Sequence, residues 1–417
     1  MPGAAGSIEH GPSSPRFRRR LFWVLAVAVI ARIAIVAYAE RHPQRFDFPD
    51  SHRYVQVALN IAAGEGPIES EEIKSGTDPL YPLLLSTGLL LGLDDSASLM
   101  CFGRIVNSLF GLACVFLLAL LGRRLVGERA AIIAAAILAV DPILLFFNTL
   151  VLTETCYTFL LLAAVLCIVR VAGSDRPFAW AASAGVCMGL GTLMRSSSLF
   201  MPLALLPLVW CLLPRGRRGR AWATLLFLLA SFAPLAPTVA RNYRLLGAFV
   251  PVRTGSGASL MEALGPWADG SPGMDRIEYP AFPHGANEHE RDRLCRRAAI
   301  EWARAHPGDV LRLALAKLKR TWSVTINADA YSTTSYKLVA WGTIAPEFLL
   351  AIAGLCLMRR RRGVLALLLV PAIYFTLLHM VFVGSVRYRV PAMPLLFVPA
   401  GVAAERLCRR VGDGKDG

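Results

Sequence analysis

The chain has 417 residues, and 55% of them are hydrophobic. Its mean hydropathy of +0.51 excludes an ordinary soluble protein, whose surface must be solvated. The formal net charge of +15 is concentrated in short runs between apolar blocks, namely Arg16–Arg20, Arg123–Arg129, Arg215–Arg220, Arg359–Arg362 and Arg406–Lys415. Such runs follow the positive-inside pattern, so we expect membrane lipids and no nucleic acid as their partners.

The first apolar segment, Leu21–Ala39, is long enough to cross a hydrocarbon layer ~30 Å thick. It is too long for a typical signal-peptide core and no cleavage site follows it, so we expect a retained first span. Residues 1–20 are predicted to be a disordered cytoplasmic tail. Residues 40–93 would then form a first outer loop, in which Asp50–Ala63 has helical periodicity and Gly64 ends the helix.

The end of this loop, Pro79–Leu93, is apolar but short, and Pro82 and Gly88 interrupt it. Runs of this length are more often interfacial or re-entrant than spanning. If the segment spanned, Arg123–Arg129 would fall outside, against the positive-inside rule. We therefore expect it to dip into the membrane without crossing it.

The sequence predicts an all-α multi-pass membrane protein of about ten transmembrane helices, with interfacial helices and a mixed extracytoplasmic loop domain. The later spans are Ser98–Leu121, Ala130–Phe147, Val151–Val171, Phe178–Met194, Leu199–Leu213, Ala221–Ala240, Val339–Met358, Val364–Phe382 and Val390–Leu407. The domains are then residues 21–240, 241–338 and 339–410, with a cytoplasmic tail at 411–417. Both termini would be cytoplasmic, and the membrane would be the plasma (inner) membrane.

The region 241–338 begins with turn-rich sequence and ends in two predicted helices. Asn287 and Glu290 form a capping pair for the first helix, which should run to about Ala305. Pro307 begins a basic amphipathic helix of the kind that lies on a membrane surface. The nine cysteines show no metal or disulfide spacing, and His284 and His289 are expected to be solvated.

Three polar clusters and one arginine fall on the predicted outer face. They are Asp47, Asp50, Arg53 and Tyr54, then Asn148, Thr153 and Glu154, then Arg387, Tyr388 and Arg389, with Arg195 at an outer span end. A carboxylate at a low-dielectric boundary can act as a general base or hold a divalent cation. Arginine offers forked donors that suit phosphate oxygens. This combination suggests transfer from a phosphorylated lipid to an outer acceptor.

Plainer interpretations stay open for several of these residues. Asp50 stands at the predicted N-cap of the helix after it, so capping alone would explain it. Arg387 and Arg389 could be headgroup anchors, and Arg195 could only pair with Glu154. Asp141, before Pro142, is interpreted as part of a helix kink.

The order of motifs resembles the GT-C superfamily of polyprenyl-phosphate-sugar-dependent glycosyltransferases. The resemblance is to the bacterial branch that includes aminoarabinose transferase and protein O-mannosyltransferase-like proteins. The matching segments are Asp50–Tyr54 (DSHRY), Asp78–Leu83 (DPLYPL), Arg104–Gly127, Leu152–Glu154, Gly189–Arg195 (GLGTLMR), Arg241–Val252 and Arg387–Pro394 (RYRVPAMP).

The resemblance implies a catalytic or metal-associated role for Asp50 and a second acidic role for Glu154. It also implies that Arg53 and Tyr54 contact the carrier phosphate, and it adds Tyr81 to the binding residues. We expect Arg387 and Arg389 to hold the same phosphate and Arg195 and Tyr388 to join the substrate-binding residues. Asp47 is expected to be a further catalytic carboxylate. The expected substrates are a polyprenyl-phosphate-linked sugar and a lipid, glycan or protein acceptor, with a divalent cation as an optional cofactor. A lipid-carrier flippase and a non-catalytic subunit of a cell-envelope polymer assembly complex remain alternatives.

Overall fold

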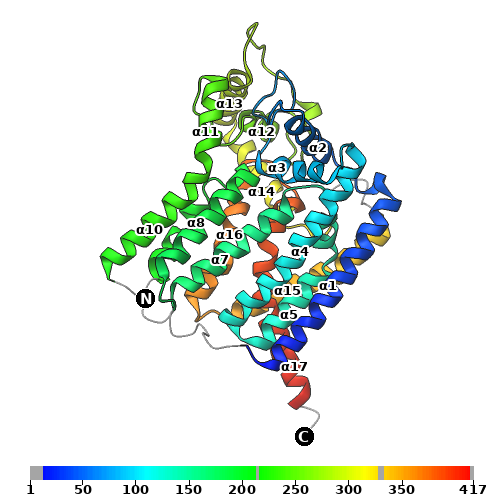
Figure 1. Cartoon of the computed structure of the whole chain (residues 1–417), viewed down its shortest axis with the longest axis vertical. Coiled ribbons are helices and arrows are strands. Elements are labelled where there is room, and N and C mark those ends of the chain that lie inside the picture. Colours follow the sequence, from blue (N-terminus) through cyan, green and yellow to red (C-terminus); the bar gives the residue numbers. More distant parts are fainter. Residues whose placement is uncertain (1–12, 213–215, 327–332, 414–417) are drawn as a thin grey trace.

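The computed structural model describes residues 13–212, 216–326 and 333–413, which form a bundle of long helices with a smaller helical layer at one end (Figure 1). The bundle contains α1 (Pro15–Arg41), α4 (Ser96–Val126), α5 (Glu128–Val140), α6 (Pro142–Thr149), α7 (Glu154–Val171), α8 (Pro177–Met194), α9 (Met201–Leu212), α10 (Arg217–Phe232), α15 (Thr334–Leu357), α16 (Arg362–Val381) and α17 (Met393–Asp413). The smaller layer contains α2 (Pro49–Ala62), α3 (Leu80–Ser86), α11 (Ala236–Leu246), α12 (Ser256–Ala263), α13 (Glu288–Ala305) and α14 (Pro307–Thr321). Short 3₁₀ turns join these helices: η2 (Pro43–Arg45), η3 (Thr87–Leu91), η4 (Ser196–Ser198), η5 (Ala233–Leu235), η6 (Met274–Arg276) and η8 (Val386–Ala392). The described ranges contain no β-strand, so the predicted all-α class is confirmed.

Eight helical segments within the described ranges are long and apolar enough to cross a membrane. They are α1, α4, α7, α8, α10 with α11, α15, α16 and Val386–Val411. The α5–α6 pair meets the same criteria only when taken together, and α9 is a shorter apolar helix. The protein is therefore a multi-pass membrane protein, and the ten predicted spans coincide with these elements. The number of segments that cross the bilayer stays a prediction.

The bend between α5 and α6 measures 53° and has a local cause. Pro142 has no N–H to continue the hydrogen bonding of α5, and the Asp141 carboxylate instead accepts a hydrogen bond from the Leu144 N–H at 2.7 Å. The predicted kink at Asp141 is confirmed.

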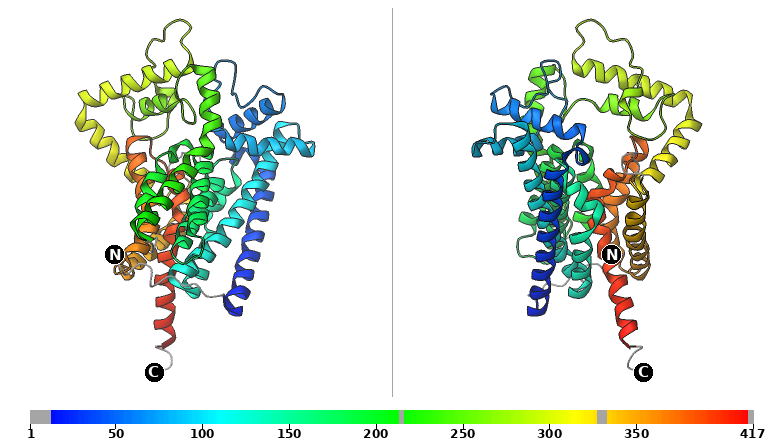
Figure 2. Two further views of the ribbon diagram at one scale, coloured as in Figure 1. Left: turned by 60° about the vertical axis from the view of Figure 1, so that its left-hand side comes forward. Right: turned by 90° about the vertical axis from the view of Figure 1, so that its right-hand side faces the viewer.

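The segment predicted as interfacial or re-entrant forms α3 and η3, and Gly92 ends it in the left-handed region (φ 79°) that glycine adopts without strain. Figure 2 shows this segment running across the end of the bundle rather than along it.

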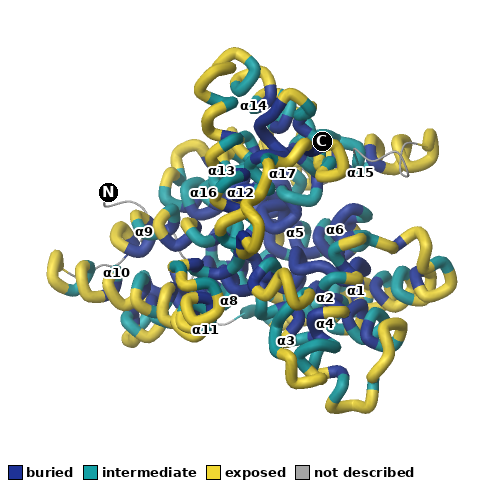
Figure 3. The backbone as a smooth tube through the Cα atoms, turned by 90° about the horizontal axis from the view of Figure 1, so that it is seen from above, coloured by how far each residue is buried: buried dark blue, intermediate teal, exposed yellow. Residues whose placement is uncertain are grey.

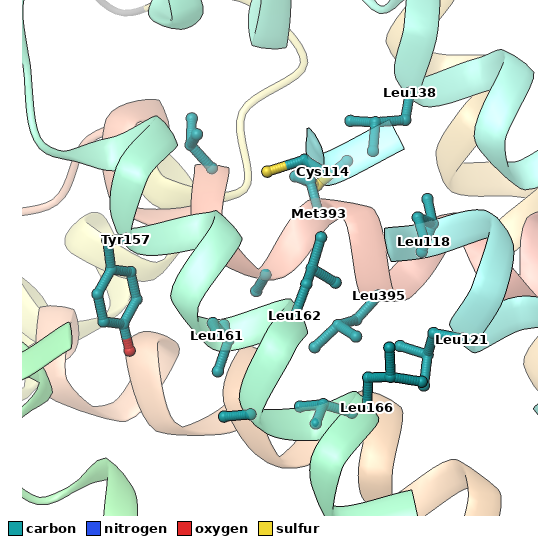
Figure 4. Close-up of a cluster of buried hydrophobic side chains, with 14 of the residues drawn as sticks. Cys114, Leu118, Leu121, Leu138, Tyr157, Leu161, Leu162, Leu166, Met393 and Leu395 are labelled. Carbon is teal, nitrogen blue, oxygen red and sulfur yellow. The ribbon is translucent and has the colours of Figure 1, made fainter. Parts of the chain in front are cut away.

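The core of the bundle lies where α4, α5, α7 and α17 meet (Figure 4). Leu118, Leu161 and Leu395 are fully buried there. Small residues let the helix axes approach each other, since a Cβ added to Gly354 or Gly401 would overlap backbone atoms of a neighbouring helix. The centre of the bundle is thus fixed by close helix packing, while α1 and α15 remain peripheral and keep large apolar side chains on their outer faces.

The two ends of the bundle differ in chemical character. The first turns of α1 and α10 and the last turns of α17 lie at one end, and α2, α11, α12 and α13 lie at the other (Figures 1 and 2). The basic runs Arg16–Arg20 and Arg406–Lys415 belong to the first end as far as they are described. This separation is what the positive-inside pattern requires.

The smaller layer is built on the predicted capping box and on a small hydrophobic cluster. Asn287 accepts from the Glu290 N–H while the Glu290 carboxylate accepts from the Asn287 N–H, and α13 ends at Ala305 as predicted. Met261, Cys295 and Val383 are among the residues of the cluster, so α12 and α13 pack against the segment after α16. Figure 3, viewed onto this layer, shows buried segments at its centre and exposed loops around them.

Two predicted boundaries shift in the structure. The predicted disordered tail, 1–20, overlaps α1, which begins at Pro15 because Ser14 caps it and Pro15 occupies its first position. At the other end α17 continues to Asp413, into the predicted tail. Residues 1–12 and 414–417 lie outside the described residues.

Candidate active site

A cavity of about 1670 Å³ lies between the end of the bundle and the smaller layer. Side chains from α2, the loop after it, the ends of α7 and α8, the segment around α12, and η8 line it. The lining is rich in arginines and carboxylates, although it adjoins apolar helices. Charged groups at such a boundary are costly unless they are paired or bind a ligand.

Arg387 lies at the centre of a chain of ion pairs at the inner side of this cavity. Its Nη1 donates to Asp50 Oδ2 at 2.6 Å and its Nε donates to Glu154 Oε1. Asp50 also accepts from Arg53, and Glu154 accepts from Arg195 Nη1 at 2.7 Å. Two carboxylates and three guanidinium groups therefore alternate across the site, which leaves one net positive charge.

Local structure positions each member of the chain. Asp50 lies in the first turn of α2, and Glu154 is the first residue of α7, so both carboxylates sit at positive ends of helix dipoles. Arg195 ends α8, and Arg387 follows Ser385, whose side chain caps η8. The predicted N-cap role of Asp50 is wrong, because Phe48 is the N-cap and Pro49 is the first helical residue.

The electrostatics of Asp50 follow from this pairing. Burial alone would raise the pKa of its carboxyl, but Arg387 and Arg53 outweigh burial and lower that pKa to about 2. Burial also raises the pKa of the neighbouring Tyr54 phenol to about 12. At neutral pH Asp50 is therefore an anion and Tyr54 remains a hydrogen-bond donor.

The guanidinium of Arg387 is not fully used by the protein. Its Nε and Nη1 donate hydrogen bonds to Glu154 and Asp50, and among the described residues no group accepts a hydrogen bond from Nη2. Since Arg387 lines the cavity, the remaining donor is available to an anionic ligand there.

The comparisons with known proteins fit this geometry. Residues 78–240 match the family described as dolichyl-phosphate-mannose-protein mannosyltransferase. No curated protein sequence is similar enough to this chain to count as a match. The archaeal oligosaccharyltransferase AglB from Archaeoglobus fulgidus, in complex with an inhibitory peptide and a dolichol-phosphate, overlaps with a TM-score of 0.58 at 15% identity. The overlap covers 95% of this chain and 51% of that chain.

The apo form of the Archaeoglobus fulgidus oligosaccharyltransferase overlaps with a TM-score of 0.54 at 14% identity, over 95% of this chain and 52% of that chain. The chain shares the fold of these two solved structures. It spans about half the length of these solved structures. ArnT from Cupriavidus metallidurans, bound to undecaprenyl phosphate, is similar at 16% identity over 91% of this chain and 78% of that chain, with a TM-score of 0.40.

The predicted binding residues differ in whether they line the cavity. Tyr54 and Tyr388 line the cavity, as do Asp50 and the three arginines of the ion-pair chain, whereas Glu154 is fully buried behind them. The Tyr388 ring stacks on the His379 ring with centroids 3.8 Å apart. The Arg195 guanidinium lies over the Tyr388 ring, 5.6 Å from the centroid of that ring. Tyr81 is buried behind Tyr54, edge to face at 5.2 Å, and supports that ring without lining the cavity.

Asp47 and Arg389 lie outside the cavity. Asp47 is exposed and lies 2.5 Å from His52 Nε2. Arg389 is buried, and its Nη1 donates to the carbonyl oxygens of Thr321, at 3.0 Å, and Ser323. The Arg389 guanidinium is bound to backbone carbonyl oxygens and does not line the cavity. The predicted contact of Arg389 with the carrier phosphate is therefore wrong.

A second polar group in the cavity was absent from the predicted site. Arg253 Nε lies 3.6 Å from Asp78 Oδ1, and the Ser196 N–H donates to the same oxygen at 3.2 Å. Burial raises the pKa of the Asp78 carboxyl although Arg253 opposes this. Asp78 belongs to the DPLYPL motif, and its place at the head of that motif was the available signal. Arg253 had no local signal, because its partners come from distant segments.

The cavity residues do not match a divalent cation site. Both oxygens of Asp50 and Oε1 of Glu154 accept from guanidinium groups, which fill the positions a cation would take. Across the described ranges, no three His, Cys, Asp or Glu side chains converge in a geometry that could hold a metal ion. His284 is exposed and His289 is half-buried, and neither joins such a group.

Proposed function

We propose that this protein is a membrane glycosyltransferase that moves a sugar from a polyprenyl-phosphate carrier to an acceptor at the outer face of the plasma membrane. The observation that carries the proposal is Arg387, held between Asp50 and Glu154 with one nitrogen left for a ligand. The GT-C fold supports it, as does the AglB structure, which contains both a dolichol-phosphate and a peptide.

The carrier phosphate would bind Arg387 and Arg53. Guanidinium groups bind phosphate through paired hydrogen bonds, and the ion-pair chain already carries excess positive charge. Tyr54 and Tyr388 would add phenolic donors. Arg195 would hold Glu154, and Glu154 in turn would hold the orientation of Arg387.

Phosphate binding would also prepare Asp50 for catalysis. In the free site the two arginines keep the pKa of Asp50 near 2, where the carboxylate is a weak base. A bound phosphate would compete for the same two arginines and so raise the proton affinity of Asp50. The carboxylate would then accept the proton of the acceptor hydroxyl or amine as that atom attacks the sugar, while the lipid phosphate leaves with its electron pair.

The membrane orientation follows the separation of charge in the fold. We propose that the cavity opens on the outer side, with residues 40–93 and 241–338 forming the outer layer. Both termini would then be cytoplasmic, next to the basic runs, and the membrane would be the inner membrane. A cation is not needed for any of these steps, since Arg387 and Arg53 supply the positive charge.

Mass spectrometry of lipids and glycans from a deletion strain tests this function. We expect loss of one sugar modification, rescue by the wild-type chain, and a reduction of roughly 100-fold or more in product with Asp50→Asn. Asp47→Asn is the matched control, because it changes an exposed carboxylate three positions away that lies outside the cavity.

An unchanged lipid and glycan profile in the deletion strain would refute the proposal. Carrier transport into sealed vesicles without sugar transfer would identify a flippase instead. Full rescue by Asp50→Asn would leave a non-catalytic role in an assembly complex as the better explanation.

A further inference from the structure

Glu262 is a cavity carboxylate that the proposed donor site does not use. It lies in α12, lines the cavity, and its residue is 8% exposed. Its Oε1 accepts from the Gly273 N–H at 2.7 Å. Among the described residues no ion pair involves Glu262, and none donates a hydrogen bond to its Oε2.

The surroundings of Glu262 distinguish it from Asp50 and Glu154. Those two carboxylates are each bound by two arginines. Burial raises the pKa of the Glu262 carboxyl, and the negative charge of Asp50 raises it further. The Gly273 N–H and Arg276 act in the opposite direction and lower that pKa. Glu262 and Asp50 line the same cavity.

The backbone around Glu262 is held firmly. The Asp292 carboxylate accepts from the Gly257 N–H at 2.6 Å at the start of α12, and Trp267 Nε1 donates to the Met261 carbonyl at 3.0 Å. A Cβ at Gly257 would overlap the backbone of α13, so these helices touch closely. Glu262 therefore projects from a rigid element, as a binding residue requires.

Two aromatic side chains line the cavity on the same side. Tyr279 is 45% exposed and Phe282 is 36% exposed, although both line a concave site. Their ring centroids lie 6.2 Å apart, and burial, with smaller contributions from Cys295 and Glu262, raises the pKa of the Tyr279 phenol. Partly exposed aromatic rings in one cavity with a carboxylate whose Oε2 accepts from none of the described residues suit a sugar ring, which stacks through its C–H face and donates hydroxyl hydrogen bonds.

We propose that Glu262, Tyr279 and Phe282 form the acceptor subsite and that the acceptor is a carbohydrate. This inference rests on the proposed function and narrows its acceptor class from lipid, glycan or protein to a sugar residue. Glu262 accepts hydrogen bonds from hydroxyls next to the attacking one, and the aromatic pair holds the ring. The subsite and Asp50 line the same cavity, so an acceptor held there can present its attacking hydroxyl to the carboxylate that takes its proton.

The test uses membranes of the deletion strain as the source of acceptor. The membranes are treated either with periodate, which cleaves neighbouring hydroxyls, or with a protease. Full-length protein and a lipid extract of untreated cells, which supplies the donor, are then added and product is measured by mass spectrometry. We expect periodate to abolish acceptor function and protease to leave it intact. A protease-sensitive, periodate-resistant acceptor would overturn the inference in favour of a protein acceptor.

Variants test the subsite itself. We expect Glu262→Gln to raise the acceptor concentration needed for half-maximal rate by roughly ten- to a hundred-fold, since hydrogen bonds to a charged group are lost. Glu262→Asp should recover part of the effect, and Tyr279→Ala should weaken acceptor use more than Tyr279→Phe. Glu301→Gln is the matched control, because Glu301 lies outside the cavity, is exposed and pairs with Arg297 at 2.9 Å.

Binding of undecaprenyl phosphate to the purified full-length protein separates this subsite from the donor site. Glu262→Gln should bind undecaprenyl phosphate as the wild type does. The assignment would be overturned if Glu262→Gln lost lipid binding as strongly as it lost acceptor use. It would also be overturned if Glu262→Gln needed the same acceptor concentration as the wild type. If wild-type protein makes no product from untreated membranes, the proposed function fails and the inference fails with it. If wild-type protein is active and Glu262→Gln behaves identically, only the inference fails.

Discussion

Replacing Arg387 with alanine tests the central element of the site. The change removes the hydrogen bonds to Asp50 and Glu154 together and leaves the Glu154 side chain, which is 0% exposed, with Arg195 as its remaining charged partner. Removing one partner of a buried ion pair costs about 3–5 kcal/mol. Asp50 contributes less, because its side chain is 27% exposed and keeps Arg53.

We therefore expect Arg387→Ala to lower the free energy of unfolding by about 3–5 kcal/mol and to abolish binding of undecaprenyl phosphate. Thermal unfolding in detergent and a lipid-binding titration measure the two effects. The double variant Arg387→Ala with Glu154→Gln should cost less than the sum of the two single variants, since both remove the same ion pair, and it should show none of the binding.

An exposed ion pair gives the control for this experiment. Arg312 lies 3.1 Å from Asp309 on α14, and both side chains are exposed, so Arg312→Ala should cost less than about 1 kcal/mol. If Arg387→Ala is no more destabilising than Arg312→Ala, or if the double variant costs the full sum of the two single variants, the assignment of Arg387 as a buried bridge is refuted.

Three further predictions concern stability. The pKa of Asp50 is lowered to about 2, so its ion pairs stabilise the fold fully at pH values above the ordinary carboxyl pKa, and this stabilisation is lost as pH falls toward 2. The difference in free energy of unfolding between wild type and Asp50→Asn should shrink by about 2 kcal/mol over that interval. Burial lowers the pKa of Lys317 to about 8, so its charge opposes folding below that pH; Lys317→Met should be more stable than wild type at pH 7, and the gap in melting temperature should narrow as pH approaches 10.5. Asn287→Ala should cost about 1 kcal/mol through loss of the capping box, with Asn287→Asp retaining most of that stability; a melting curve identical to wild type would contradict the cap.

The sequence by itself determined the class of the protein and much of its local structure. Apolar length and basic runs identify a multi-pass helical membrane protein, because these properties depend only on the residues within each segment. The start of α14 at Pro307, the capping box of α13 and the kink at Asp141 were predictable for the same reason. Polar residues at predicted outer span ends indicated Asp50, Glu154 and Arg387 as candidates.

Only the tertiary structure decided how these candidates combine. Arg387 meets Asp50 across 337 positions and Glu154 across 233, and helical periodicity does not specify which distant helix ends become neighbours. The same packing turns Arg389, two residues later, toward backbone carbonyls, and it brings Arg253 to Asp78. Glu262 carried no sequence signal, because only the packed structure shows that none of the described residues forms an ion pair with it. Local patterns specify elements and faces, whereas the site depends on which faces pack together.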